Sequence, residues 1–152
     1  MHPTRRAMLS LSAAALAATS CAGKTPSQLA TDVGLIASGL ASVVTSLAQA
    51  PGVPAATLAQ LQGWLATIEA DAAQVAAASA GAGGVVEFAR AVQALAAIAL
   101  PLIPGGSAIA ALIDAAMSLL PMVLGTVGIS GAPLAAPVYA PDQARLILRA
   151  VR

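Results

Sequence analysis

The sequence predicts an all-α protein: two antiparallel helical hairpins forming a four-helix bundle-like domain, with an N-terminal signal helix before it and a short C-terminal helix after it. Three observations lead to this class. Apolar residues recur at alternating spacings of three and four along four segments. Proline and glycine clusters interrupt this pattern at 50–54, 79–84 and 104–107. Hydrophobic residues make up 59% of the 152 residues and charged residues only 9%, so we expect helices that bury broad apolar faces against one another.

Residues 1–22 have the order of a secretory signal peptide. Arg5 and Arg6 precede an uncharged stretch that ends in small residues around position 22. This stretch is too short and too rich in alanine for a membrane anchor. Residues 4–9 (TRRAML) resemble a twin-arginine translocation motif, with Arg5 and Arg6 as the signal-recognition residues. The alternative is a general secretory leader that carries two arginines.

Cys21 is the only cysteine and lies where the apolar run ends. Residues 16–21 (LAATSC) resemble a bacterial lipoprotein cleavage box, except that Ala18 stands where leucine is usual. The resemblance implies that Cys21 is acylated, that membrane lipid is a partner, and that the protein is sorted to an outer membrane if its source is Gram-negative. The alternative is cleavage after Ala22, which would discard the thiol. A lone thiol cannot form an internal disulfide, which favours the lipid anchor.

Residues 25–78 predict the first hairpin. Thr25, Pro26 and Gln28 supply an N-cap, a proline at the first helical position and a variant of the capping box. The first apolar stripe is Leu29, Val33, Ile36, Leu40, Val43 or Val44, and Leu47; the second is Leu58, Leu61, Leu65, Ile68, Ala72 and Val75. If the chain folds back near residue 52, each apolar residue of the first stripe lies opposite an apolar residue of the second, as an antiparallel hairpin requires.

Residues 84–125 predict a second, more apolar hairpin. Its stripes are Val85, Phe88, Val92, Leu95, Ala99 and Leu102, then Ile109, Leu112, Ala116, Leu119 and Val123. Ser107 is the expected N-cap of the second helix, and Pro121 is expected to kink or end it. Residues 126–152 predict a Gly/Pro-rich connector and a basic C-terminal helix from Asp142 to Arg152, with Pro141 at or before its first turn.

The long apolar stretch at 91–129 contains one charge, Asp114. The summed free energy of inserting the second helix of this hairpin into a bilayer lies close to zero, and Pro101 and Pro104 cut the first helix short of the roughly 20 residues of a span. We therefore expect this hairpin to be the buried half of a bundle or to adhere to a membrane surface, in preference to crossing the membrane. In either setting Asp114 needs a polar partner, and the reflected register predicts a buried pair with Arg90 or Gln93.

Few residues offer catalytic chemistry. His2 lies in the leader and Cys21 at its end, so the rest of the chain has no imidazole and no second thiol for metal, haem or triad chemistry. Glu69 and Asp71 point to different sides of a helix. We expect no enzyme, no catalytic residue, no cofactor and no metal, and a net charge of +1 disfavours nucleic acid as a partner.

Arg145, Arg149 and Arg152 repeat at spacings of four and three, which forms a basic stripe on the C-terminal helix. One interpretation is a solvated helix whose arginines complement the negative end of its dipole. The other is docking onto an anionic surface, such as lipid headgroups.

Three functions remain open. The first is a non-enzymatic, lipid-anchored envelope protein that acts as a structural or interaction module and binds itself or another envelope protein. The second is a membrane-perturbing, lysis- or toxin-like hairpin that uses residues 91–129, and the third is a carrier of an apolar ligand. The layout is similar to small Ala-rich exported proteins of proteobacteria, some of them phage-associated, and this resemblance implies an envelope or lysis role.

Overall fold

The computed structural model describes residues 25–77, 81–126, 128 and 137–151, and in this part of the chain it is helical without strands. The elements are α2 (Pro26–Gln49), α3 (Ala55–Ala76), α4 (Ala82–Ala99), the short 3-10 helix η1 (Leu100–Leu102), α5 (Ala108–Thr126) and α6 (Pro141–Arg149). The expected signal peptide, with Arg5, Arg6 and Cys21, lies outside the described residues.

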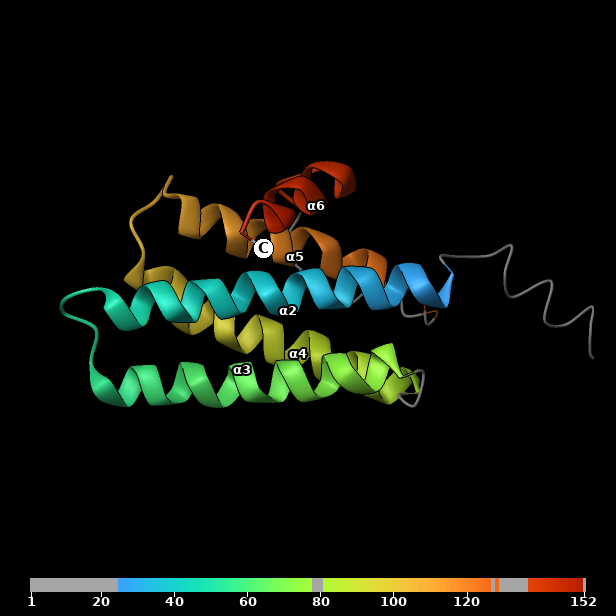
Figure 1. Cartoon of the computed structure of the whole chain (residues 1–152), viewed down its shortest axis with the longest axis horizontal. Helices are drawn as coiled ribbons and strands as arrows, with labels where there is room; N and C mark the ends of the chain where they lie inside the picture. The colour runs from blue at the N-terminus through green and yellow to red at the C-terminus, as the bar shows by residue number, and fades with distance from the viewer. Residues whose placement is uncertain (1–24, 78–80, 127, 129–136, 152) are drawn as a thin grey trace, which may run out of the picture.

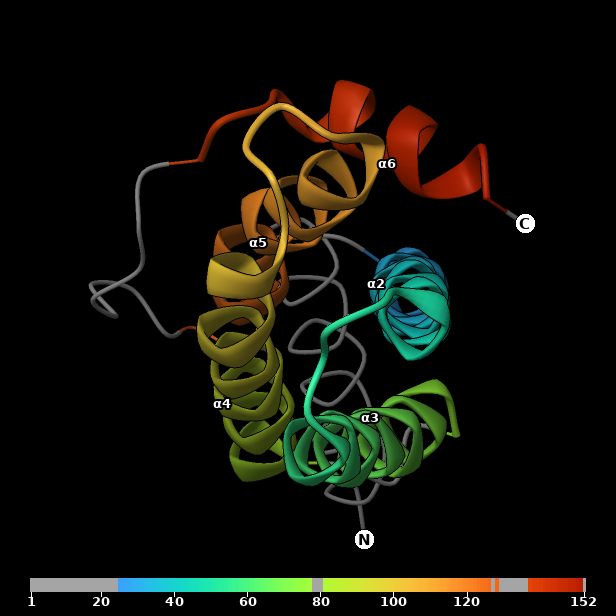
Figure 2. The same cartoon turned by 90° about the vertical axis from the view of Figure 1, so that its left-hand side faces the viewer.

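Helices α2 and α3 lie side by side and antiparallel along most of their length (Figure 1). Seen end-on, α2, α3, α4 and α5 stand around a common centre, and α6 lies over α2 and α5 (Figure 2). Accordingly, α2 contacts α3, α5 and α6, whereas α4 contacts α3 more extensively than it contacts α5. The first and last helices of the described chain are therefore neighbours.

The start of α2 confirms the predicted capping box. The Thr25 backbone N–H donates to Gln28 Oε1 at 3.2 Å, and the Gln28 backbone N–H donates to Thr25 Oγ1 at 3.4 Å. Pro26 occupies the first helical position, where its missing N–H removes no helical hydrogen bond. At the other end of α2, Gly52 has φ +86° in the turn to α3, a value that suits glycine.

The four predicted apolar stripes all face the interior. Every residue in them is buried or half-buried, and one continuous core runs through α2, α3, α4, α5 and α6. Phe88 is the largest fully buried side chain. The predicted N-cap of α5 is also confirmed, because the Ala110 backbone N–H donates to Ser107 Oγ at 3.2 Å.

One expectation about helix ends was wrong, because α4 begins at Ala82 and Gly83 and Gly84 lie in its first turn rather than in the loop. At Pro121, where a kink or an end was expected, the end does not occur, since α5 continues to Thr126. Proline removes only one backbone donor, and the buried Leu119, Leu120, Val123 and Leu124 on both sides of it hold the helix together by packing.

Among the residues that the structure describes, three helical stretches are long and apolar enough to cross a membrane: Pro26–Gln49, Gly83–Leu102 and Ala108–Thr126. The second reaches 20 residues because η1 continues α4 through Pro101, which corrects the expectation that the prolines leave it too short. Helix α2, which precedes the second hairpin, also meets the criterion. About half of each stretch is buried inside the protein, from 44% to 56%.

Candidate functional site

A buried ion pair joins the first and last described helices. Arg145 of α6 donates from Nε to Asp32 Oδ1 at 2.8 Å and from Nη2 to Asp32 Oδ2 at 3.0 Å. Asp32 is 2% exposed, and the side chain of Arg145 is 21% exposed. Two parallel hydrogen bonds between a planar guanidinium and a carboxylate are the strongest form of protein ion pair and fix the relative orientation of both groups.

Arg145 also reaches Asp142 within α6. Its Nη1 donates to Asp142 Oδ1 at 2.9 Å, and this second carboxylate is 95% exposed. The hydrogen bonds to Asp32, together with the Asp32 and Asp142 charges, raise the pKa of Arg145 above its ordinary value, although burial opposes the shift. The guanidinium therefore stays charged at every physiological pH, and the pair holds α6 against α2 through a permanent positive charge.

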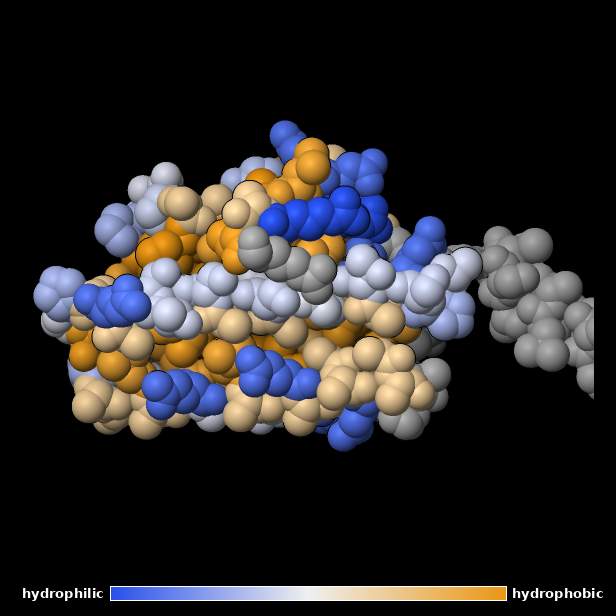
Figure 3. Space-filling view, in the orientation of Figure 1, coloured by the Kyte–Doolittle hydropathy of each residue, from blue (hydrophilic) through white to orange (hydrophobic). Residues whose placement is uncertain are grey.

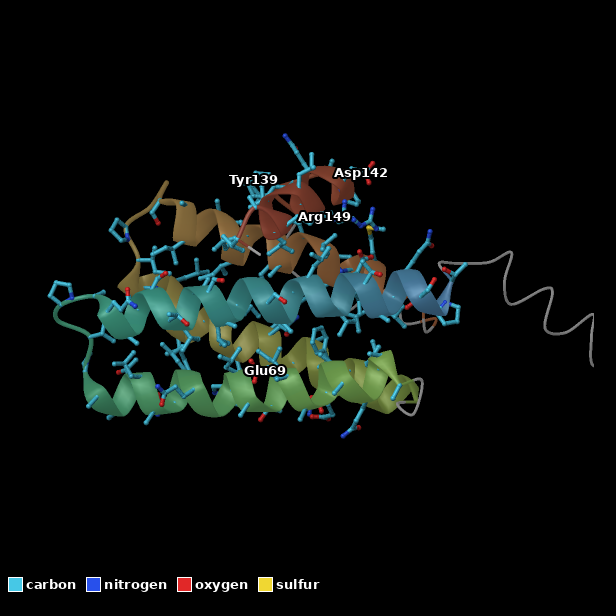
Figure 4. The ribbon with its side chains drawn as sticks, viewed as in Figure 1. Glu69, Tyr139, Asp142 and Arg149 are labelled. Carbon is cyan, nitrogen blue, oxygen red and sulfur yellow. The ribbon has the colours of Figure 1, made fainter. Side chains whose placement is uncertain are left out.

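The ion pair lies in the wall of a groove of about 710 Å³ between the first turns of α2, the second half of α5 and α6. The groove is lined by Ser27, Gln28, Thr31, Asp32, Met122, Asp142, Arg145, Leu146 and Arg149. Asp142 and Arg149 are carried by α6, Tyr139 lies just before it, and Glu69 lies apart on α3 (Figure 4). Charges of both signs and two hydroxyls thus surround the opening.

Two further contacts fix α6 and the segment before it. The Tyr139 backbone N–H donates to Ser118 Oγ at 3.2 Å, and Ser118 is one of two buried polar residues in the described chain. On the other side, Leu148 packs directly on Gly39 of α2, so closely that a Cβ at Gly39 would overlap the Leu148 side chain. An alanine at Gly39 would therefore require the end of the Leu148 side chain to move.

The arginines of the predicted basic stripe do not share one exposed surface. Arg145 turns inward to Asp32 and is not on the outer surface, because its helix packs Ala144 and Leu148 into the core and places Arg145 beside them. Arg149 is exposed at the mouth of the groove, and Arg152 lies outside the described residues. One arginine of the stripe therefore remains on the described surface.

The predicted pair of Asp114 with Arg90 or Gln93 is not formed among the described residues. Arg90 is 66% exposed and donates from Nη1 to Glu87 Oε1 at 2.9 Å, a surface ion pair within one turn of α4. At Asp114 the backbone carbonyl accepts the Ser118 hydroxyl at 2.6 Å. The expected register does not form, and α4 packs more extensively on α3 than on α5.

The other acids do not assemble a site. Glu69 is exposed, whereas one carboxylate oxygen of Asp71 is buried without a hydrogen-bond partner. Burial raises the pKa of Asp71, and the charge of Glu87 raises it further. In the described residues no group of three or more His, Cys, Asp or Glu side chains could hold a metal ion. Trp64 is half-buried and lines a shallow hollow of about 350 Å³ beside Ile98.

Sequence reasoning missed Asp32, the acid at the centre of this site. One signal was available: Asp32 interrupts the apolar pattern of the first helix directly before Val33, on a helix whose other residues up to 50 carry no charge. An acid in such a setting requires a partner. The partner lies 113 residues away, which no local spacing rule connects.

No protein-family model, curated protein or solved structure matches this chain.

Proposed function

We propose that the protein is a non-enzymatic, exported envelope lipoprotein that acts as a structural or interaction module. Residues 4–9 and 16–21 support export and acylation through their resemblance to a twin-arginine motif and a lipoprotein box. The observation that carries the proposal is the position of the first helix. The capped start of α2 at Thr25 follows Cys21 by four residues, which span at most about 14 Å. A lipid on Cys21 would hold this end of the domain at the membrane surface.

The contacts between helices support the finer architecture that the sequence predicts. Helix α2 packs on α3 and α5, and α4 packs on the same two helices. This arrangement favours a four-helix bundle made of two hairpins and closed by α6. The domain would present α3 to other molecules, because α3 buries only four residues and exposes many alanines. Figure 3 shows this helix as an apolar strip broken by separate polar residues.

Mass spectrometry of the mature protein tests the anchor. We expect an N-terminal diacylated or triacylated Cys21, and a Cys21→Ser variant that leaves the membrane fraction. Ser20→Ala is the matched control because it changes the neighbouring residue and keeps the thiol. A mature chain that begins at Gly23, or a Cys21→Ser variant that still sediments with membranes, would contradict the anchor.

Cross-linking tests the interaction surface. Ala66 and Ala73 are exposed on α3, and glutamate at either position would place a charge on an apolar contact. We expect cross-linked species of the parent to disappear in Ala66→Glu and Ala73→Glu while the melting temperature stays unchanged. Gln143→Glu is the control, because it adds the same charge at an exposed position of α6. Equal cross-linking in all variants would exclude this face.

A membrane-perturbing protein is the second candidate, and the three apolar helices favour it. In this interpretation the second hairpin, within 91–129, would leave the core and enter a bilayer. Leakage of an encapsulated dye from phospholipid vesicles on addition of the purified protein would support it. An intact vesicle population at protein concentrations that saturate the lipid surface would exclude it.

A further inference from the structure

The face of α2 beneath α6 is distinct from the face that packs against α3. Asp32, Leu35 and Gly39 follow each other at spacings of three and four, so they share one side of the helix. Asp32 binds Arg145, and Gly39 receives Leu148, so this side lies under α6. Leu35, between them, is 1% exposed. Without α6, Leu35 and the Asp32 carboxylate on this side of α2 would face solvent.

Helix α5 has a corresponding side. Ser118 and Met122 lie one turn apart on it; Ser118 holds the backbone of Tyr139, and Met122 lines the groove beside Leu146. Helices α2 and α5 contact each other, and α6 contacts both. The inner surface of α6, Ala144 and Leu148, is fully buried against them. The terminal helix thus covers the seam between two of the three helices that are apolar enough for a bilayer.

We propose that the seam of α2 and α5 is a lipid-contact surface, that α6 is a clasp that covers it in the water-soluble state, and that the Asp32–Arg145 ion pair holds the clasp closed. The inference goes beyond the envelope anchor and does not depend on it. The occupant of the uncovered seam is the acyl-chain region of a bilayer, because both helices have the length and composition of a membrane span.

The ion pair suits a clasp because it resists partial opening. The Asp32 carboxylate is 2% exposed and accepts two hydrogen bonds from the guanidinium of Arg145, and a small rotation of α6 breaks this bidentate geometry. The apolar contacts of Ala144 and Leu148 also hold α6 in place, and they do not require one fixed orientation of the helix. α6 itself also carries an exposed apolar residue, Leu146 at 65%, so its outer side can enter a lipid surface when the inner side is released.

Trypsin measures the closed state because Arg145 and Arg149 are its cleavage sites. The test uses the full chain with Cys21→Ser, so that no acyl group contributes to lipid binding and a failed anchor cannot affect the result. We expect Asp32→Asn to speed cleavage after these arginines by roughly tenfold or more, equivalent to about 1.4 kcal/mol. We also expect it to increase co-flotation with vesicles of phosphatidylethanolamine and phosphatidylglycerol.

Glu69→Gln is the matched control for charge. It removes an exposed carboxylate on α3, which does not carry the clasp, so cleavage and flotation should stay close to the parent. If Asp32→Asn is as resistant to trypsin as the parent, the ion pair is not the clasp. If α6 is released and flotation does not rise, the seam is not a lipid-contact surface.

A second pair of variants opens the clasp without changing charge. Gly39→Ala forces the new Cβ against Leu148, whereas Gly34→Ala on the same helix meets no atom within 4 Å. Both substitutions raise helix propensity equally. We therefore expect faster cleavage and more flotation for Gly39→Ala alone, with α-helical circular dichroism unchanged. Identical behaviour of the two variants would overturn the proposal even if Asp32→Asn fails to fold.

Discussion

Helices α3 and α5 are similar in length and differ sharply in how much of their surface is covered. Helix α5 buries ten of its 19 residues, and α3 buries four of its 22. Helix α5 has three helical neighbours, α2, α4 and α6, whereas α3 packs against α2 and α4. The additional neighbour is α6, which covers a side of α5 that would otherwise face solvent.

This difference explains why the most apolar helix is compatible with a water-soluble fold. A helix that is apolar on nearly all sides must be surrounded by protein or by lipid. In α5 most of this role is filled by protein, because 56% of its apolar stretch is buried inside the chain. Helix α3 needs less cover because its outer positions are alanine, glutamine and glycine. Hydropathy alone therefore does not separate a core helix from a membrane span.

The largest expected difference between the two helices is in core truncation. Leu119 in α5 is fully buried, and Leu65 in α3 is half-buried. We expect Leu119→Ala to lower the free energy of unfolding by about 2–5 kcal/mol, and Leu65→Ala to lower it by roughly 1 kcal/mol because little area leaves the core. Urea unfolding followed by circular dichroism measures both. Equal losses would show that α3 is as well covered as α5.

The cover provided by α6 is tested by Arg145→Lys. Lysine keeps the charge and loses the two parallel hydrogen bonds to Asp32, so we expect a loss of about 1.5–3 kcal/mol in the free energy of unfolding. Arg149→Lys, an exposed position on the same helix, should change stability little. In Arg145→Lys, the rate of amide hydrogen exchange should rise in α6 and α5 and stay unchanged in α3. Uniform exchange across the three helices would contradict a local role.

A smaller effect is expected at the start of α2. Thr25→Ala removes the side-chain acceptor of the capping box and should lower stability by about 1 kcal/mol. Thr45→Ala, on an exposed turn of the same helix where the hydroxyl bonds only the Ala41 carbonyl in the described chain, is the control. Thermal melts of the two variants should differ by a few degrees, and coincident melts would show that the cap is not stabilising.

The smallest expected effect depends on pH and lies in α3. The folded state raises the pKa of Asp71, so it favours the protonated carboxyl. This contribution is present below the unfolded pKa and is lost as the pH rises through the folded value. Asp71→Asn should therefore raise the urea midpoint slightly at neutral pH and leave it unchanged near pH ~3. Glu69→Gln, exposed on the same helix, should show no such trend. A constant difference at both pH values would contradict the assignment.

Local chemistry made most helices predictable from the sequence. Periodic apolar residues predicted the buried faces of α2 to α5, and Pro51, Gly52 and Ser107 marked their boundaries. Of the two outcomes expected at Pro121, a kink or an end, the end does not occur, because tertiary packing compensates for one missing donor. The caps at Thr25 and Ser107 were predicted correctly, whereas Gly83 and Gly84 were expected in a loop and lie in α4.

The candidate site was less predictable for the same reason. The pairing of Asp114 with Arg90 assumed that α4 and α5 contact each other evenly along their length, whereas α4 contacts α3 more extensively than it contacts α5. The Asp32–Arg145 pair joins residues that no periodicity relates. Arg145 was therefore assigned to a surface stripe from spacing alone. The fate of Cys21, which determines the anchor, depends on processing outside the described domain and stays a prediction.

The ion pair that spans 113 residues has a consequence for synthesis. Asp32 is synthesised 113 residues before Arg145. A product that stops before residue 145 would therefore carry the Asp32 carboxylate without the two hydrogen bonds from Arg145 that hold α6 on α2.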